Sequence, residues 1–335
     1  MIRHPLQDLP GLDDIEDAAA RISGVTVHTP LLRSDDLDRL VGAPVWIKPE
    51  SLQRTGSFKM RGAWNRISRI PHADRERGVV AFSSGNHAQG VAESARMLGL
   101  QATIVMPADA PRTKIEAARG RGARIRLYDR ARESREAIAA GIASESGATT
   151  IRPFDDSWII AGQGTVGLEA LTDGRRKGVA FGSLVCNASG GGLLAGVATA
   201  FEALSETTQV WSAEPAGHDD ILRSLAAGRI VKNEPGYRSI ADALLAPEPG
   251  VLPFEIHKRR LTGGFAVTNE QILDAMSFAF HQLKLVIEPG GACSLSAVLN
   301  NRRHFAERAP VLIILSGGNV DADLFAQALA RPPLS

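Results

Sequence analysis

The chain has 335 residues, of which 44% are hydrophobic and 22% are charged, and its formal net charge is +1. This composition is normal for a soluble globular protein, and the length allows one large domain or two ordinary ones. The near-zero charge excludes a global field that would favour nucleic acid or an anionic membrane. Residues 1–14 contain no signal-like apolar run, and no stretch approaches about 18 uninterrupted apolar residues. We therefore expect a cytoplasmic protein that binds neither nucleic acid nor membrane.

Short apolar segments typical of strands alternate with helical patterns from about residue 45 onward. This alternation predicts an α/β fold with a parallel sheet covered by helices. The connection 215–267 is rich in Pro and Gly, and its pattern predicts no element. Strands are expected over 45–48, 78–83, 102–106, 124–128, 183–186, 209–213 and 311–315, and helices over 88–98, 113–121, 133–145, 162–171, 191–204 and 269–283.

The two cysteines, Cys186 and Cys293, have neither the C-x-x-C spacing nor a Cys/His metal spacing. They can therefore be interpreted as two buried thiols in a reducing compartment, with no further role.

A glycine-rich loop, Ser189-Gly190-Gly191-Gly192-Leu193, follows one predicted strand and opens a predicted helix. Successive glycines let backbone N–H groups approach an anion closely, and the helix N-terminus adds a positive dipole. The loop could equally be a tight turn without a ligand, so the segment alone leaves phosphate binding open.

Two further segments carry candidate chemistry. The loop Ser83-Ser84-Gly85-Asn86-His87 offers several donors to a carboxylate, although a plain helix cap explains it as well. Lys59 lies between Phe58 and Met60; burial there would lower the pKa of its amine and suit it to Schiff-base chemistry, although most lysines are exposed. Together with the glycine loop, these segments supply what a pyridoxal-phosphate (PLP) enzyme acting on an amino acid requires.

The order of these motifs resembles that of the fold-type II PLP enzymes, in particular the threonine/serine dehydratases and serine racemases. The resemblance covers about residues 15–325. The motifs that carry it are Ser57-Phe58-Lys59-x-Arg61-Gly62, Ser84-Gly85-Asn86-His87, Ala161-Gly162-Gln163-Gly164-Thr165, Gly190-Gly191-Gly192-Leu193-x-Ala195-Gly196 and Ser316-Gly317-Gly318-Asn319.

The resemblance implies a role for each matching residue. Lys59 would form the Schiff base with the cofactor and later act as base at Cα. The cofactor would also be held by Phe58 against the ring, by Asn86 on the phenolic oxygen, by Ser189, Gly190, Gly191, Gly192 and Leu193 on the phosphate, and by Ser316 facing the ring nitrogen. Ser83, Asn86, His87 and Arg135 would lie around the substrate carboxylates.

A divalent cation site is implied too, formed by the carboxylates of Glu214 and Asp220 with the carbonyl of His218. These are hard oxygen ligands that suit Mg²⁺ or Ca²⁺, although two solvated acids would give the same pattern. Ala243 stands where the family usually has Gly, and Ala246 stands where racemase-like members offer Ser. Both departures bear on the choice of substrate.

The resemblance further implies two three-layer α/β domains and a homodimer. We expect a large PLP-binding domain from residues 1–76 and 155–335, with a small α/β domain, 77–154, inserted between them. The site would lie between the two domains, where closure on the substrate is plausible.

The expected activity is dehydration and deamination of a small β-hydroxy amino acid, such as L-threonine or L-serine, to a 2-oxo acid and ammonia. Ser84 would face Cα opposite Lys59, an arrangement that also allows serine racemisation. Arg135 could favour 3-hydroxyaspartate, and a dehydratase of hydroxyectoine degradation is a further alternative. A non-catalytic phosphate- or nucleotide-binding protein would explain the glycine loop, but it would not need Lys59, Asn86 and Ser316 together.

Overall fold

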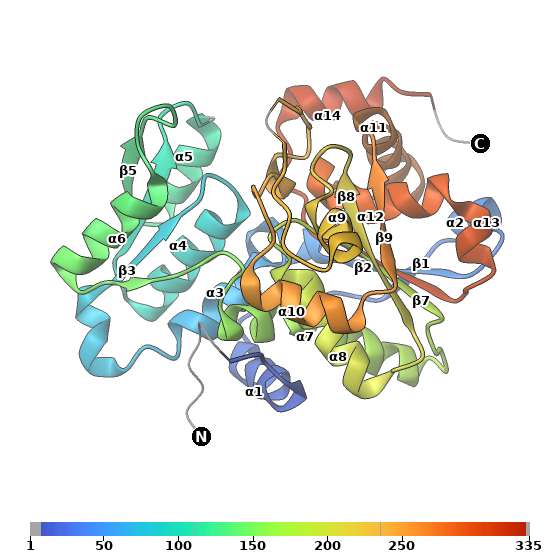
Figure 1. The fold of residues 1–335 in the computed structure, drawn as a ribbon, viewed down its shortest axis with the longest axis horizontal. Helices are drawn as coiled ribbons and strands as arrows, with labels where there is room; N and C mark the ends of the chain where they lie inside the picture. The colour runs from blue at the N-terminus through green and yellow to red at the C-terminus, as the bar shows by residue number, and fades with distance from the viewer. Residues whose placement is uncertain (1–7, 111, 235, 333–335) are drawn as a thin grey trace.

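The computed structural model describes residues 8–110, 112–234 and 236–332. Among these residues the strands form two sheets in which every neighbouring pair is parallel except β1 and β2 (Figure 1). The predicted α/β fold with parallel-rich sheets is confirmed. The larger sheet has the order β1-β2-β10-β7-β8-β9, made of β1 (Leu32–Arg33), β2 (Val45–Pro49), β10 (Val311–Leu315), β7 (Ser183–Asn187), β8 (Gln209–Pro215) and β9 (Gly263–Val267).

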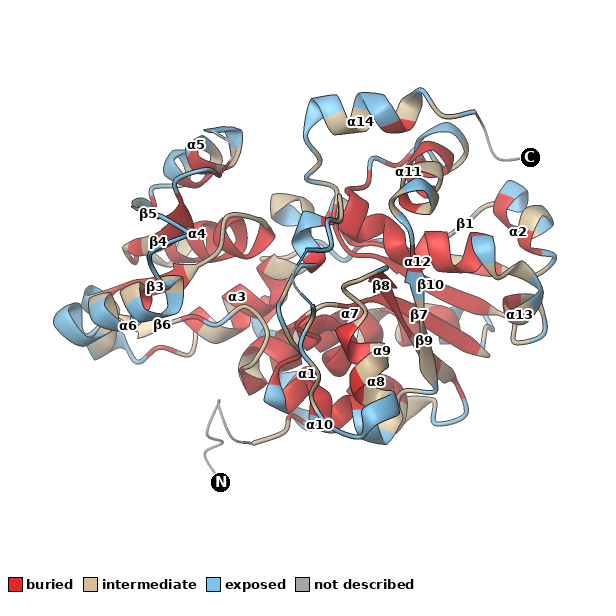
Figure 2. Ribbon diagram, turned by 45° about the horizontal axis from the view of Figure 1, so that its top comes forward, coloured by how far each residue is buried: buried red, intermediate tan, exposed pale blue. Residues whose placement is uncertain are grey.

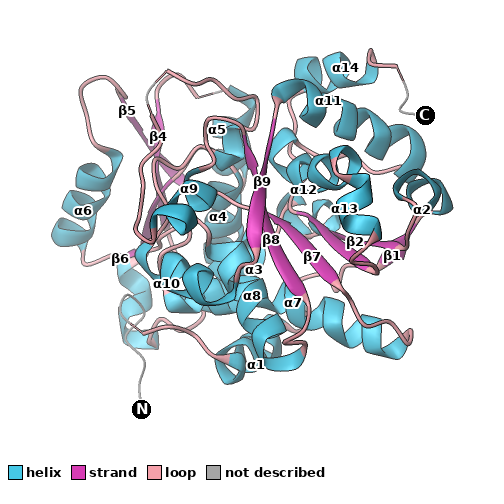
Figure 3. Ribbon diagram, turned by 45° about the vertical axis from the view of Figure 1, so that its right-hand side comes forward, coloured by secondary structure: helices cyan, strands magenta, loops and turns pink. Residues whose placement is uncertain are grey.

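Strand β10 shows how the larger sheet is held between two helical layers (Figure 3). All five of its residues are apolar and fully buried, which is typical of a central parallel strand. Leu312 and Ile314 pack toward α1 (Leu12–Ile22), α7 (Ser157–Arg176), α8 (Gly192–Leu204) and α10 (Val251–Arg260). Val311, Ile313 and Leu315 point to the opposite face, which is covered by α2 (Asp35–Val41), α11 (Asn269–Phe278), α12 (Pro289–Asn300), α13 (Arg302–Ala306) and α14 (Ala322–Leu329).

The smaller sheet has the order β5-β4-β3-β6, made of β5 (Arg124–Tyr128), β4 (Ala102–Pro107), β3 (Val79–Phe82) and β6 (Thr149–Thr150). Helices α3 (Lys59–Ile67), α4 (Asn86–Leu98) and α5 (Arg112–Gly120) pack on one face, and α6 (Arg135–Ser146) packs on the other. This sheet lies wholly inside the predicted small domain, 77–154, although the domain boundaries themselves stay a prediction. The chain ends assigned to the large domain, 1–7 and 333–335, lie outside the described residues.

The connection 215–267, for which the sequence predicted nothing, contains α9 (Asp220–Ala227), the short 3₁₀ helix η4 (Asp242–Leu244), α10 and β9. Strand β9 begins with two glycines, which are unfavourable in a strand because they bring no side chain to pack. Here Trp211 and Ser212 of β8 occupy the space over Gly263 and Gly264. The expected helix 269–283 is α-helical only to Phe278 and continues as a π-helical turn, Ala279–Leu283.

Burial is concentrated in the strands of the larger sheet and the helices packed on it, whereas the outer turns are exposed (Figure 2). Within the described part of the chain, none of the helices combines the length and apolar character that crossing a bilayer requires.

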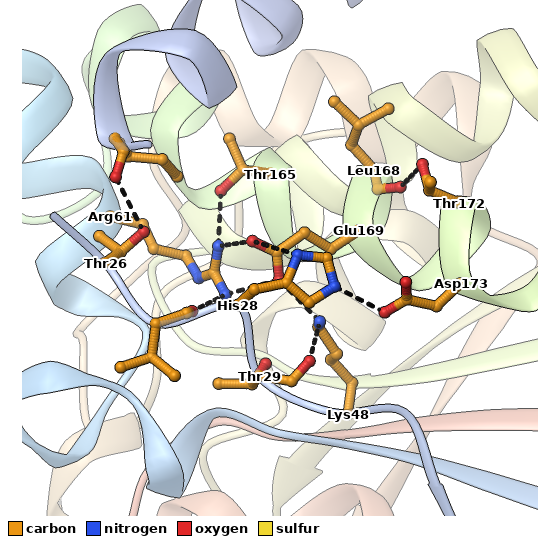
Figure 4. A network of polar contacts seen from close by, with 12 residues as sticks. Thr26, His28, Thr29, Lys48, Arg61, Thr165, Leu168, Glu169, Thr172 and Asp173 are labelled. Carbon is orange, nitrogen blue, oxygen red and sulfur yellow. Dashed lines mark hydrogen bonds and ion pairs between the residues drawn. The ribbon is translucent and has the colours of Figure 1, made fainter. Parts of the chain in front are cut away.

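A buried network of charges fixes helix α3 to the body of the protein (Figure 4). The guanidinium of Arg61 is fully buried and forms a two-bond pair with Glu50, both at 2.8 Å, and a second pair with Glu169 at 2.7 and 2.9 Å. The buried Lys48 ammonium donates to Glu169 at 2.7 Å and to the carbonyl of Thr29 at 2.6 Å. Burial alone would raise the pKa of Glu169, but Arg61 and Lys48 outweigh it and lower that pKa. Two cations and two anions therefore compensate one another.

Removing one member of this network should lower the free energy of unfolding far more than removing one member of a surface ion pair. We expect Arg61→Ala to lower the free energy of unfolding by about 3–5 kcal/mol, because the buried carboxylate of Glu50 would lose its ion pair and Glu169 would keep only that with Lys48. The control Arg119→Ala removes a half-exposed pair with Glu116 and should change stability by about 0.5 kcal/mol or less. Equal denaturant midpoints for the two variants would contradict this assignment.

Candidate active site

A cavity of about 730 Å³ lies between the two sheets, close to the carboxyl ends of their strands. This is the edge at which open α/β sheets bind ligands, and the volume is in the range of small-molecule sites. The structure brings together here every residue that the sequence assigned to cofactor or substrate. Those lining the cavity are Phe58, Lys59, Ser83, Ser84, Asn86, His87, Ser189, Gly190, Gly191, Gly192, Leu193, Arg135 and Ser316.

Lys59 is the first residue of α3, and its position is set by pairing between two distant segments. Residues 56–58 run beside 316–318: the Phe58 N–H donates to the Ser316 carbonyl at 3.1 Å, and the Gly318 N–H donates to the Gly56 carbonyl at 2.9 Å. The Lys59 amine donates to the Pro153 carbonyl at 2.6 Å. Burial lowers the pKa of Lys59 to about 7, so a large share of the amine is neutral at physiological pH.

Asn86 is held from two sides. Its amide donates to Glu288 at 2.6 Å, and its oxygen accepts from Asn319 at 2.7 Å. Burial, together with the negative charge of Asp242, raises the pKa of Glu288 to about 8. A Glu288 side chain that stays protonated near neutral pH avoids an uncompensated charge beside the cavity.

The Ser83–His87 loop leads into α4 without a side-chain cap at Gly85, so the first N–H groups of the helix are available to an anion. The Ser83 hydroxyl accepts from the Gly85 N–H at 3.2 Å. His87 Nε2 lies 3.0 Å from the Ile151 carbonyl, which can only accept, so Nε2 carries the proton. Burial and the nearby Lys59 lower the pKa of His87 to about 3, and the neutral ring presents Nδ1 as an acceptor.

The glycine loop forms a cradle that side chains would fill. Gly191 has φ of +93°, which favours glycine, and a Cβ on Gly190 would stand 2.3 Å from the Phe154 ring. The N–H of Gly250 donates to the Gly190 carbonyl at 3.0 Å, and the N–H of Ala246 donates to the Ser189 hydroxyl at 3.0 Å. Helix α8 begins at Gly192 without a side-chain cap, which leaves its first N–H groups for an anion.

Ser316 is nearly fully buried, and its hydroxyl accepts from Asn187 at 3.1 Å. The same Asn187 amide donates to the carbonyls of Gly291 and Ile314, each at 3.0 Å, so its position is fixed. Arg135, at the start of α6, pairs with Glu136 at 2.8 Å and lies over the Phe82 ring at 5.6 Å. Arg130 also lines the cavity and pairs with Asp109.

Several cavity residues were not predicted from the sequence, chiefly Phe154, Asn187, Asp242 and Glu288. One signal was available: Asn187 ends a strand at the sheet edge where ligands bind. Glu288 precedes α12, in a segment for which the sequence predicted no element. Only the tertiary fold brings its carboxyl group to the amide of Asn86.

The predicted metal residues lie outside this cavity. Glu214 is fully buried and accepts from the N–H groups of Ile221 and Leu222, at 2.9 and 3.0 Å, and so caps α9. Burial and the charge of Asp220 raise its pKa to about 8, and burial raises that of Asp220 to about 6. His218 is partly exposed, and its ring lies 3.3 Å from the Tyr237 carbonyl. Across residues 8–110, 112–234 and 236–332, no group of three His, Cys, Asp or Glu side chains could hold a metal ion. The two-carboxylate site stays a prediction.

The chain matches known proteins along nearly its whole length. Residues 22–317 match the family described as "Pyridoxal-phosphate dependent enzyme". The chain is 41% identical to an L-threo-3-hydroxyaspartate ammonia-lyase from a Pseudomonas species over 96% of this chain and 99% of the relative. It is 38% identical to an L-threonine ammonia-lyase from Thermotoga maritima, over 93% of this chain and 76% of the relative. The structure of maize serine racemase matches with a TM-score of 0.90 at 36% identity, covering 96% of this chain and 97% of the other.

The chain belongs to the pyridoxal-phosphate-dependent enzymes. The predicted family and its fold type are confirmed, and the ammonia-lyases among the relatives support the expected reaction type. The site itself fits the cofactor: an amine of lowered pKa, a glycine cradle at an uncapped helix start and a fixed hydroxyl at Ser316 surround one cavity.

The lowered pKa of Lys59 predicts how cofactor capture depends on pH. Only the neutral amine attacks an aldehyde, so the rate at which the apoenzyme takes up PLP should rise from about pH 6 and level off above about pH 8. Stopped-flow absorbance between pH 6 and 10 measures this rate. A rate that kept rising toward pH 10 would show that Lys59 has an ordinary pKa.

Proposed function

We propose that this protein eliminates water from a small β-hydroxy amino acid and yields a 2-oxo acid and ammonia. We expect L-threonine and L-serine to be its principal substrates. The observation that carries the proposal is the buried amine of Lys59, whose pKa is lowered to about 7, in the cavity that also contains the glycine cradle and the Ser83–His87 loop. A protein that only bound phosphate would need neither that amine nor the fixed hydroxyl of Ser316.

In this proposal the N–H groups from Gly190 to Leu193 would hold the cofactor phosphate, and Ser316 and Asn86 would bind the ring nitrogen and the phenolic oxygen. Bound pyridoxal phosphate supplies the electron sink that makes the Cα–H bond of an amino acid acidic. Lys59 takes the Cα proton, since a base with a pKa near 7 is well matched to neutral pH. The Cβ hydroxyl leaves with a proton as water, and the released 2-enamino acid then takes up one water and hydrolyses to the 2-oxo acid and ammonia.

The substrate carboxylate would lie on the N–H groups that open α4, with the Ser83 and Ser84 hydroxyls beside them. His87 lines this part of the cavity, but its neutral ring presents an acceptor, so we assign it to shaping the loop. Ser84 and Lys59 both line the cavity, which keeps racemisation of serine as an accompanying activity.

A second candidate substrate is 3-hydroxyaspartate. Arg130 and Arg135 both line the cavity, and their side chains are 54% and 38% exposed, so they can turn toward a second carboxylate. The 41% identical relative is named for this substrate.

A substrate comparison tests these assignments. We expect 2-oxo acid release from L-threonine, L-serine and L-threo-3-hydroxyaspartate, all abolished by Lys59→Ala. If the arginines bind the second carboxylate, Arg135→Gln should reduce kcat/KM for hydroxyaspartate at least about tenfold more than for serine, since a charged hydrogen bond contributes about 1.5–3 kcal/mol. Arg132→Gln is the control, since Arg132 is highly exposed and does not line the cavity.

The same assay separates elimination from racemisation. Ser84→Ala should retain elimination and lose conversion of L- to D-serine, followed by chiral chromatography. No 2-oxo acid from any of these substrates would overturn the proposed reaction, and equal losses for serine and hydroxyaspartate in Arg135→Gln would overturn the second candidate.

We also propose that Glu214 and Asp220 hold Mg²⁺ or Ca²⁺ together with the His218 carbonyl. Asp220 Oδ2 is buried and has no hydrogen-bond partner among the described residues, which leaves an oxygen for a cation. After EDTA treatment, either cation should raise the melting temperature, and Glu214→Gln should abolish that increase. The exposed Glu255→Gln is the control. No response to either cation in the parent protein would exclude the site.

We also propose that the protein is located in the cytoplasm and forms a homodimer. The two thiols, Cys186 and Cys293, are buried and unpaired, as they would be in a reducing compartment.

A further inference from the structure

His257 lies behind the glycine loop and has no part in the proposed reaction. It is on α10, which packs against α8, and its side chain is fully buried (Figure 1). Its ring contacts the backbone of Gly191, but neither ring nitrogen has a hydrogen bond of good geometry to any described residue. A buried polar group without a partner costs about 1–3 kcal/mol, so an apolar residue would serve better here if packing were the only requirement.

The contact with Gly191 is close. A Cβ on Gly191 would stand 2.5 Å from Cε1 of His257 and 2.9 Å from the side chain of Pro253, so only glycine fits over the imidazole. Burial lowers the pKa of His257 to about 3, so the ring is neutral and carries one N–H. The Gly191 carbonyl already accepts from the Ala195 N–H at 2.8 Å and has a second lone pair for another donor.

The geometry of the peptide unit connects this carbonyl to the phosphate site. In a trans peptide the C=O of Gly191 and the N–H of Gly192 point in opposite directions. A donor that holds the carbonyl toward α10 therefore turns the Gly192 N–H outward, at the uncapped start of α8. The Gly190 carbonyl is tethered in the same way by the Gly250 N–H, which fixes the Gly191 N–H.

We propose that His257 is a positioning residue for the phosphate of the cofactor: its ring N–H holds the Gly191 carbonyl, so that the N–H groups of Gly191 and Gly192 face the phosphate. The inference rests on the proposed cofactor site. It predicts an effect confined to the phosphate group, which distinguishes it from a role in packing.

The test compares PLP with pyridoxal, which lacks the phosphate. His257→Phe keeps a ring of similar shape but removes the N–H, whereas His257→Gln keeps a donor. Holoenzymes loaded with either compound are diluted, and the retained cofactor is measured by absorbance. We expect His257→Phe to bind PLP about tenfold more weakly, because a backbone N–H that is no longer held in place weakens one hydrogen bond to the charged phosphate, with pyridoxal binding unchanged. His257→Gln should recover part of the loss.

The ³¹P resonance of bound PLP supplies a readout that activity does not. It should shift in His257→Phe and remain in place in the control His304→Phe, which lies in the aromatic cluster of Trp211 and Phe265, away from the loop. Unchanged PLP affinity and an unchanged ³¹P signal in His257→Phe would overturn the inference, and so would equal weakening of PLP and pyridoxal. If His257→Phe does not fold, His257→Gln decides: PLP binding that weakens by less than tenfold with pyridoxal binding unchanged supports the donor role, and unchanged PLP binding or equal weakening of PLP and pyridoxal overturns it. Failure of the parent protein to bind PLP would instead overturn the proposed function.

Discussion

The buried guanidinium of Arg61 is the constraint on which the geometry of the site depends. It stands two residues after Lys59 on α3 and ties that helix to β2 and its 3₁₀ extension through Glu50 and to α7 through Glu169. Helix α7 is far from the other two segments in the sequence, since Arg61 and Glu169 are 108 residues apart. Because the charges are balanced and fully hydrogen-bonded, the desolvation cost of burying them is offset, and α3 can begin at a fixed point on the cavity wall.

The backbone pairing of 56–58 with 316–318 joins the segment before Lys59 to the segment that contains Ser316. It places the Lys59 amine and the Ser316 hydroxyl on one cavity, and Asn187 then orients the hydroxyl. The remaining groups come from segments near the carboxyl ends of the parallel strands in the two sheets. The site is therefore assembled by topology, with each loop supplying one kind of contact: amine, phosphate cradle or carboxylate-binding N–H groups.

The sequence predicted the loops of the site better than their surroundings. The glycine run and Ser84-Gly85-Asn86-His87 follow strands, and local pattern is enough to find such loops because they need glycine and small polar residues. Strand β10 was equally clear, since a central parallel strand is apolar on both faces. In contrast, β9 begins with two glycines that are explained only by Trp211 and Ser212 on the neighbouring strand. Glu288 and His257 could not be predicted because their importance comes from contacts with Asn86 and Gly191, which are distant in the chain. Helix α9 was missed because its capping carboxylate, Glu214, lies on the preceding strand.

The central claim is that Lys59 carries the cofactor, and reduction by borohydride tests it most directly. Borohydride converts a Schiff base into a stable secondary amine, so the purified protein should gain the mass of one reduced pyridoxyl phosphate group. Peptide mapping should place that mass on the peptide that contains Lys59, and Lys59→Ala should gain none. A modified peptide that contains a different lysine, or no modification after incubation with PLP, would contradict the account.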